Sequence, residues 1–290
     1  MKDVYSTSRR KLLRGFFLNF LFSLIEFLTA FLTNSIALLA DALHDLGDAS
    51  FLLLSWVSGK LALKAPTKRK TWGYHRATIL SAFFNGIALL LITFFIFYKA
   101  YERLQNPREI IGLPLILLSF FGIALNGLAV WNLRGSKDIV VKSGFYHLLE
   151  DFLGWIGILA VGLVSSFTHL YVIDPLITFG IGLLVLKGAA EIVSYSFHLL
   201  MEGAPLEIDI GKLESDIKKI KGVKDLHDIH VWALGSRYYA FSAHVVVDDM
   251  KVSETRNILR KIKEVLKKKY NVIHPVIQFE CKKCRWKIMH

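Results

Sequence analysis

Six apolar stretches, each about long enough to cross a lipid bilayer, recur through the first two thirds of the chain and stop near Met201. A transmembrane helix needs about 20 mostly apolar residues. The chain is 53% hydrophobic with a mean hydropathy of +0.44, which is more apolar than an ordinary soluble domain. We therefore expect an all-α transmembrane domain over residues 1–204, with six helices at 12–33, 36–59, 78–103, 112–133, 144–167 and 172–200.

Lysine and arginine are distributed unevenly between these segments. The N-terminus and the connections between segments two and three and between four and five are rich in them, whereas the connections on the other side contain only Lys99, Arg103 and Arg108. Cytoplasmic loops of membrane proteins contain the excess of basic residues. The pattern predicts an integral protein of the inner or plasma membrane with both termini in the cytoplasm.

The pattern of residues 205–290 predicts a small α+β domain with the element order αββαβ. We expect a helix over 210–222, strands over 223–234 and 238–247, a helix over 253–270 and a strand over 271–280. Gly222 is expected to end the first helix, and Ser253 to cap the second.

The second apolar segment contains four ionisable residues within eight positions, namely Asp41, His44, Asp45 and Asp48. Such groups cost several kcal/mol each in a bilayer and usually mark a pathway for ions or protons. His44 and Asp48 are four positions apart, so they share one face of a helix, and Asp41 lies one turn earlier on nearly the same face. Spacing alone leaves open which of the four residues form a site.

The fifth segment repeats the spacing with His147 and Asp151, and it too has an extra acid, Glu150. The two segments therefore share one His and one Asp at positions i and i+4. Two nitrogen and two oxygen ligands match a tetrahedral zinc site, whereas Ca²⁺ and Mg²⁺ favour oxygen ligands alone. The repeat favours a transition-metal site over structural His–Asp pairs or a proton path without metal.

Other polar residues lie within or beside the apolar segments. Asn19, Asn126 and Glu26 are expected to form hydrogen bonds between helices, with a proton or ion relay as the alternative for Glu26. Asp174 precedes Pro175 and is expected to cap the sixth helix.

Several motifs resemble those of the cation diffusion facilitator family. They cover nearly the whole chain in order, and they are "SIALLADALHDLGD", "TWGYHRATILSAF", "GFYHLLEDFLGW", "IDPLITFGIGLLVL" and "DIHVWAL". The resemblance implies a homodimer with six membrane spans and a cytoplasmic domain of the ferredoxin-like, metallochaperone-like kind. It also implies export of divalent transition metals in exchange for protons.

The resemblance implies specific residues for the transport site. These are His44, Asp48, His147 and Asp151, with Asp41 as a supporting residue. It further implies a charge interlock between Arg76 and Glu202, near the hinge of the dimer, which we expect to be partly shielded from solvent.

In the cytoplasmic domain the resemblance implies metal binding by His227, His244 and Glu280, with His274 as a further candidate. His230 is expected to be an ordinary strand residue. Cys281 and Cys284 form a C-x-x-C pair that can either join a zinc site or remain free.

The chain also departs from the pattern of some family members. Those members have a second metal site between spans two and three, where this chain has Lys70 and Tyr74 in place of ligands. His75 alone is a poor site, so we expect none there.

Together the residues and the resemblance predict an exporter that exchanges cytoplasmic Zn²⁺ for protons, with Zn²⁺ also as a regulatory ion. The alternatives are a transporter of Cd²⁺, Co²⁺, Fe²⁺ or Mn²⁺, a passive channel, and a non-transporting metal sensor. An enzyme is not expected, because the sequence has no HExxH motif and four ligands leave no open metal position. The net charge of +12 suits contact with anionic lipid, so no nucleic-acid partner is expected.

Overall fold

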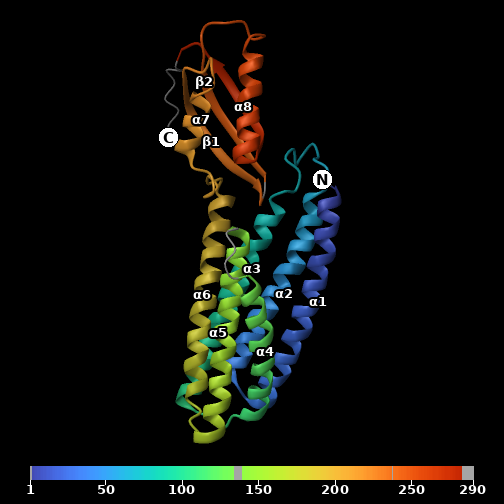
Figure 1. Ribbon diagram of the computed structural model, residues 1–290, viewed down its shortest axis with the longest axis vertical. Helices are drawn as coiled ribbons and strands as arrows, with labels where there is room; N and C mark the ends of the chain where they lie inside the picture. The colour runs from blue at the N-terminus through green and yellow to red at the C-terminus, as the bar shows by residue number, and fades with distance from the viewer. Residues whose placement is uncertain (1, 134–138, 237, 283–290) are drawn as a thin grey trace. The chain divides into compact units, whose positions relative to one another are not determined.

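The computed structural model describes residues 2–133, 139–236 and 238–282 (Figure 1). Within these described residues, six long helices precede a small domain of two helices and three strands. The elements are α1 (Lys2–Thr33), α2 (Ile36–Ala62), α3 (Ala77–Gln105), α4 (Gly112–Leu133), α5 (Ile139–Thr168), α6 (Ile173–Leu200), α7 (Ile210–Lys218), β1 (Asp225–Gly235), β2 (Tyr238–Val246), α8 (Thr255–Tyr270) and β3 (Val272–Glu280). The predicted fold class, an all-α region followed by a small α+β domain, is confirmed.

The chain forms two compact units. The first unit contains Met1–Trp56 and Phe84–Val193, and the second contains Val57–Phe83 and Ser194–His290. The second unit therefore has two parts. One part is the connection between α2 and α3 together with the adjoining ends of these helices, and the other is the end of α6 together with the C-terminal domain (Ile210–Glu280).

Among the described residues, five helices are long and apolar enough to cross a membrane. These spans are Leu13–Thr33, Ala77–Gln105, Gly112–Asn132, His147–Thr168 and Ile173–Leu200. Helix α2 matches them in length with 27 residues, but ionisable side chains interrupt its apolar sequence. Large apolar side chains such as Leu18 and Leu32 are 69% and 74% exposed, as expected for helices that face lipid.

Trp155 of α5 belongs to the buried hydrophobic core of the first unit. It is 1% exposed and packs in a cluster with Ala30, Leu38 and Ile158. A Cβ atom on Gly122 of α4 would lie 2.2 Å from the Trp155 ring, so only glycine allows the two helices to approach this closely. The packing fixes α5, which carries His147 and Asp151.

Asp174 caps a different helix from the one expected. Its carboxylate accepts hydrogen bonds from the Ser35 hydroxyl and from the backbone N–H groups of Ile36 and Ala37, the latter two at 2.8 and 3.1 Å. These N–H groups begin α2 and have no partner within their own helix. The prediction that Asp174 caps α6 is therefore wrong, because tertiary packing brings the start of α2 to this carboxylate.

The C-terminal domain has the predicted order αββαβ. Its sheet has the strand order β1-β2-β3, with β1 and β2 antiparallel and β2 and β3 parallel. One face packs against both helices, as Leu213 of α7, Phe241 of β2 and Ile262 of α8 are fully buried in one cluster. The expected cap by Ser253 is wrong, because α8 begins at Thr255 with Glu254 at its cap position.

The other face of the sheet carries histidines. His227 on β1 lies opposite His244 on β2, and Glu280 on β3 lies opposite Val246 of β2. A bulge between His227 and His230 gives Asp228 a positive φ of 53°. Because side chains alternate between the faces of a strand, these residues gather on the face away from α7 and α8.

Candidate metal centres

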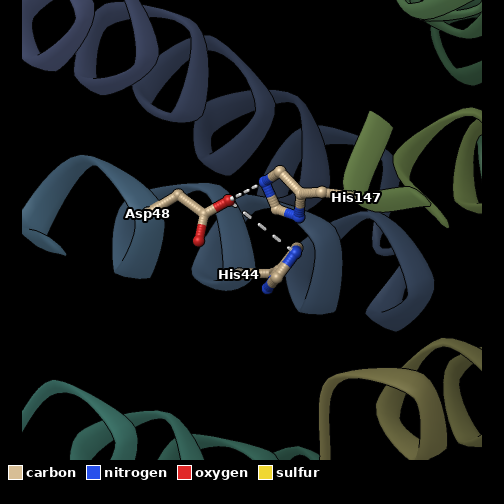
Figure 2. A group of neighbouring side chains, drawn as sticks. All are labelled: His44, Asp48 and His147. Carbon is tan, nitrogen blue, oxygen red and sulfur yellow. Dashed lines mark ion pairs between the residues drawn. The ribbon is translucent and has the colours of Figure 1, made fainter. Parts of the chain in front are cut away.

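Helices α2 and α5 bring four side chains together within the first unit. His147 Nε2 lies 2.9 Å from Asp48 Oδ2, and His44 Nε2 lies 3.7 Å from Asp151 Oδ1. Within each helix the His–Asp distance is 3.9 Å. Figure 2 shows His44, Asp48 and His147 converging from the two helices. The two pairs that share a spacing in the sequence thus form one cluster.

The cluster has the composition and size of a tetrahedral zinc site. Ligand bonds of about 2.0–2.1 Å in a tetrahedron separate the ligand atoms by about 3.3 Å. The four His–Asp distances, from 2.9 to 3.9 Å, fall on both sides of this value. His44 Nδ1 is buried without a hydrogen-bond partner among the described residues. This arrangement can coordinate a divalent transition metal with small movements of the side chains.

A cavity of about 120 Å³ opens beside the cluster. Its lining includes all four side chains, together with Asp41 and Glu150, and aliphatic residues of α3 and α6 complete the wall. The side chains of His44 and Asp151 are 17% and 15% exposed, whereas His147 is 48% exposed. The cavity therefore gives an ion and water access to a site that is otherwise surrounded by apolar groups.

A second cluster lies on the open face of the C-terminal sheet. Glu280 Oε1 is 3.0 Å from His244 Nδ1, and Glu280 Oε2 is 3.4 Å from His227 Nε2. The two imidazole rings are 5.2 Å apart. Both nitrogens of His227 and Nδ1 of His244 are buried without a hydrogen bond among the described residues. Two imidazoles beside a carboxylate fit a zinc ion.

Comparisons with known proteins match both parts of the chain. The family model of the cation efflux transmembrane domain matches residues 12–201, and that of the cation efflux protein cytoplasmic domain matches residues 205–282. The chain belongs to the cation efflux family. The resemblance to the cation diffusion facilitators is thereby confirmed, and with it an integral membrane protein of the efflux class.

Members of the cation efflux family from bacteria align with nearly the whole chain. The cadmium, cobalt and zinc/H(+)-K(+) antiporter of Bacillus subtilis is 35% identical over 94% of this chain and 89% of its own. The zinc transporter ZitB of Pectobacterium atrosepticum is 35% identical over 96% and 88%. The solved metal-bound C-terminal domain of the CzcD transporter from Cupriavidus metallidurans is 37% identical over 25% of this chain and 99% of its own, with a TM-score of 0.23.

In this cation efflux protein the C-terminal cluster includes an acid that sequence reasoning missed. Asp228 Oδ2 lies 3.5 Å from His244 Nε2, and Asp228 Oδ1 lies 3.1 Å from His230 Nε2. In a regular strand Asp228 would face away from His227. The bulge alters this alternation, and the only sequence signal is that Asp tolerates a positive φ.

Other predicted residues lie apart from the two clusters. His274 does not join the C-terminal cluster, since it pairs with Ala240 along the sheet and its ring lies 4.8 Å from that of Trp72. Cys281 is exposed with a free thiol, and Cys284 lies outside the described residues. In the connection between α2 and α3, the Lys70 ammonium lies over the Tyr74 ring at 4.6 Å.

Arg76 and Glu202 meet within the second unit. Arg76 Nη2 donates a hydrogen bond to Glu202 Oε1 at 2.9 Å. The side chains are 41% and 67% exposed, so the pair is more open to solvent than the sequence-based expectation of a shielded bridge. An exposed ion pair contributes about 0–1 kcal/mol to stability.

Proposed function

We propose that this protein exports Zn²⁺ from the cytoplasm in exchange for protons, through a site formed by His44, Asp48, His147 and Asp151. The observation that carries the proposal is the convergence of two separate His-x-x-x-Asp pairs into one cluster, with His147 of α5 only 2.9 Å from Asp48 of α2. The cluster borders a cavity within the apolar helices. Neither pair alone has enough ligands to replace the hydration shell of the ion.

The chemistry of these side chains couples metal to protons. Imidazole must be neutral and carboxylate ionised to bind a metal, so zinc binding releases protons from the site. Histidine titrates near neutral pH, which allows protons to refill the empty site under physiological conditions. If the site opens alternately to the two sides of the membrane, it returns with protons after it has released zinc. The proton gradient then drives zinc outward.

Zinc is the preferred substrate in this proposal because two of the four ligands are imidazoles. Hard ions such as Ca²⁺ and Mg²⁺ favour sites made of oxygen ligands alone. Cadmium and cobalt are secondary candidates, supported by the name of the relative from Bacillus subtilis, which includes both metals. Manganese is the least suited of the candidate substrates, because it favours carboxylate, carbonyl and water ligands.

The C-terminal domain is proposed to bind a regulatory zinc ion through His227, His244 and Glu280, with Asp228 as an additional ligand. A bound ion would supply a cross-link among β1, β2 and β3, which carry these residues. We further propose that the protein acts as a homodimer with both termini in the cytoplasm. The distribution of basic residues supports this orientation.

Purified protein in vesicles with an imposed pH gradient tests the proposal. Wild-type protein should move zinc against the proton flow, and alanine at His44, Asp48, His147 or Asp151 should reduce zinc flux to the level of empty vesicles. Glu191→Gln is a matched control, because Glu191 is an exposed acid on α6 that is not among the residues lining the cavity. Normal transport by two of the four alanine variants would contradict the assigned site.

The same vesicles distinguish the alternatives. A passive channel would conduct zinc down its own gradient without responding to the pH gradient. A metal sensor would bind zinc without any flux. Either result in the wild-type protein would overturn the proposed exchange.

A further inference from the structure

Two carboxyl groups inside the first unit have unsatisfied oxygen atoms. Glu26 of α1 is 0% exposed, and neither of its carboxyl oxygens has a hydrogen-bond partner among the described residues. Asp41 of α2 is 4% exposed, and its Oδ2 likewise lacks a partner there. An ionised carboxylate that is buried and unpaired is very costly, and in practice such a group takes up a proton. Side chains of this kind inside a membrane usually serve a function.

Contacts between α1 and α2 place the two acids at the same level of the bundle. The Ser23 hydroxyl donates a hydrogen bond to the Ala42 carbonyl at 2.7 Å, which fixes the packing of the two helices. Glu26 lies three residues after Ser23, on the same face of α1. Asp41 directly precedes Ala42 in α2.

Among the described residues, the charged neighbours of Glu26 are acids. The charged groups that act on it are Asp41 and Asp45 of α2 and Asp151 of α5, all of them acidic. Helix α4 also packs against α1, and its sequence Gly112–Leu133 includes no titratable side chain. A negative charge on Glu26 is therefore opposed both by burial and by its neighbours, unless a positive charge arrives nearby.

Asp41 connects Glu26 with the proposed metal site. It lines the same cavity as His44, Asp48, His147 and Asp151. Its Oδ1 faces α5, since a Cβ atom on Gly154 would lie 3.3 Å from it. Glu26 is not among the residues that line this cavity, whereas Asp41 is.

We propose that Glu26 and Asp41 form a proton-binding site that is occupied while the metal site is empty and releases its proton when the divalent ion binds. The inference rests on the proposed function and deepens it by adding a site for the exchanged proton. The positive charge of the ion stabilises the carboxylate. Asp41 first gives its own proton to water in the cavity, and the proton of the Glu26 carboxyl then passes to the Asp41 carboxylate, so that one proton leaves the site and Glu26 ends as the carboxylate. No other bond forms or breaks.

If Glu26 has a purely structural role, a different result is expected. A Glu26 that keeps its proton throughout the cycle would fill space between α1 and α2, and its replacement by Gln would leave proton release unchanged. An exchanging Glu26 contributes to the number of protons released for each zinc ion bound. Counting protons therefore separates the two roles, which a loss of transport alone does not.

The experiment measures zinc binding and proton release by the full-length protein in weakly buffered detergent solution. All variants carry His227→Ala and His244→Ala, so that zinc binds at the membrane site only. We expect Glu26→Gln to bind one zinc ion as before but to release about one proton fewer for each ion. Glu26→Asp should restore the release, and the exposed control Glu191→Gln should match the parent protein.

Unchanged proton release by Glu26→Gln would overturn the inference. If that variant does not fold, Asp41→Asn provides the same test, because the proton must pass through Asp41, and unchanged release by this variant overturns the inference equally. A parent protein that binds no zinc at the membrane site would instead refute the proposed function. The two failures are thus distinguishable.

Discussion

His147 on α5 lies closer to Asp48 on α2 than to Asp151 on its own helix, at 2.9 against 3.9 Å. His44 on α2 is likewise slightly closer to Asp151 on α5 than to Asp48, at 3.7 against 3.9 Å. The closest contacts of the cluster therefore cross between two helices. A movement of α2 against α5 would change these distances directly, which links the binding of an ion to the arrangement of the helices.

Replacement of His44 by Asp should change the selectivity of transport. The variant keeps a ligand at the same position but exchanges a neutral imidazole for a carboxylate, which suits harder or larger ions. We expect His44→Asp to transport still, with higher cadmium and manganese fluxes relative to zinc. His147→Asp should shift the ratios the same way. Fluxes of the three metals measured in the same vesicles provide the test, and unchanged ratios in both variants would mean that neither histidine contacts the ion.

The bridge between Arg76 and Glu202 should make only a small contribution to stability. Because both side chains are substantially exposed, we expect a coupling energy of about 0.2–1 kcal/mol that decreases with added salt. A double-mutant cycle of Arg76→Ala and Glu202→Gln measures it. Glu202 has a positive φ of 64°. Gln is preferred to Ala at this position because it keeps a side chain of the same length, so that the measured coupling energy reflects the loss of charge. Strictly additive effects at low salt would show that the two charges do not interact.

Loss of the Asp174 carboxylate should destabilise the start of α2. Asp174→Ala leaves the N–H groups of Ile36 and Ala37 without their acceptor, which typically costs about 1–3 kcal/mol at a buried site. Asp174→Asn keeps one acceptor oxygen and should cost less. Thermal unfolding in detergent provides the measurement. Equal melting temperatures for wild type and Asp174→Ala would contradict the capping role.

The C-terminal domain should bind zinc when it is expressed alone as residues 205–290. Calorimetry should detect one site, which the double variant His227→Ala, His244→Ala eliminates and Glu280→Gln weakens. His274→Ala serves as the control and should bind normally, because His274 lies apart from the cluster. In the full-length protein the same double variant should alter the zinc dependence of transport without abolishing it. Absence of zinc binding by the intact domain would refute the regulatory site.

Asp216 should make the stability of the C-terminal domain dependent on acid pH. Its carboxylate accepts hydrogen bonds from Lys269 Nζ and Tyr270 Oη at 2.8 and 3.0 Å, which lowers its pKa below the ordinary value. The added stability is complete above the unfolded-state pKa of about 4 and disappears as the pH falls through the lower folded-state pKa. Asp216→Asn should therefore be less stable than wild type at neutral pH but not at about pH 2.

Urea unfolding of the isolated domain across this pH range measures the difference. Asp249→Asn removes an exposed acid and provides the control for the change in net charge. A constant difference in the free energy of unfolding between wild type and Asp216→Asn at all pH values would show that ionisation of Asp216 is not its cause.

The sequence by itself determined the features that depend on local composition and spacing. Long apolar runs predicted the six long helices, because a helix in lipid satisfies its own backbone hydrogen bonds whatever lies beside it. Alternating and helical periodicities predicted the order αββαβ for the same local reason. The repeat of His and Asp at i and i+4 in α2 and α5 selected His44, Asp48, His147 and Asp151 from a larger set of ionisable residues.

Only the tertiary structure decided which residues from distant parts of the chain meet. Asp174 caps α2 instead of α6, and Glu26 lies among the acids of α2 and α5, because the packing of helices brings together positions that no local pattern relates. In the sheet, one bulge turned Asp228 toward His244 and so changed the set of ligand candidates. Periodicity specifies the face of an element on which a side chain lies, whereas the partner on that face depends on how the elements pack.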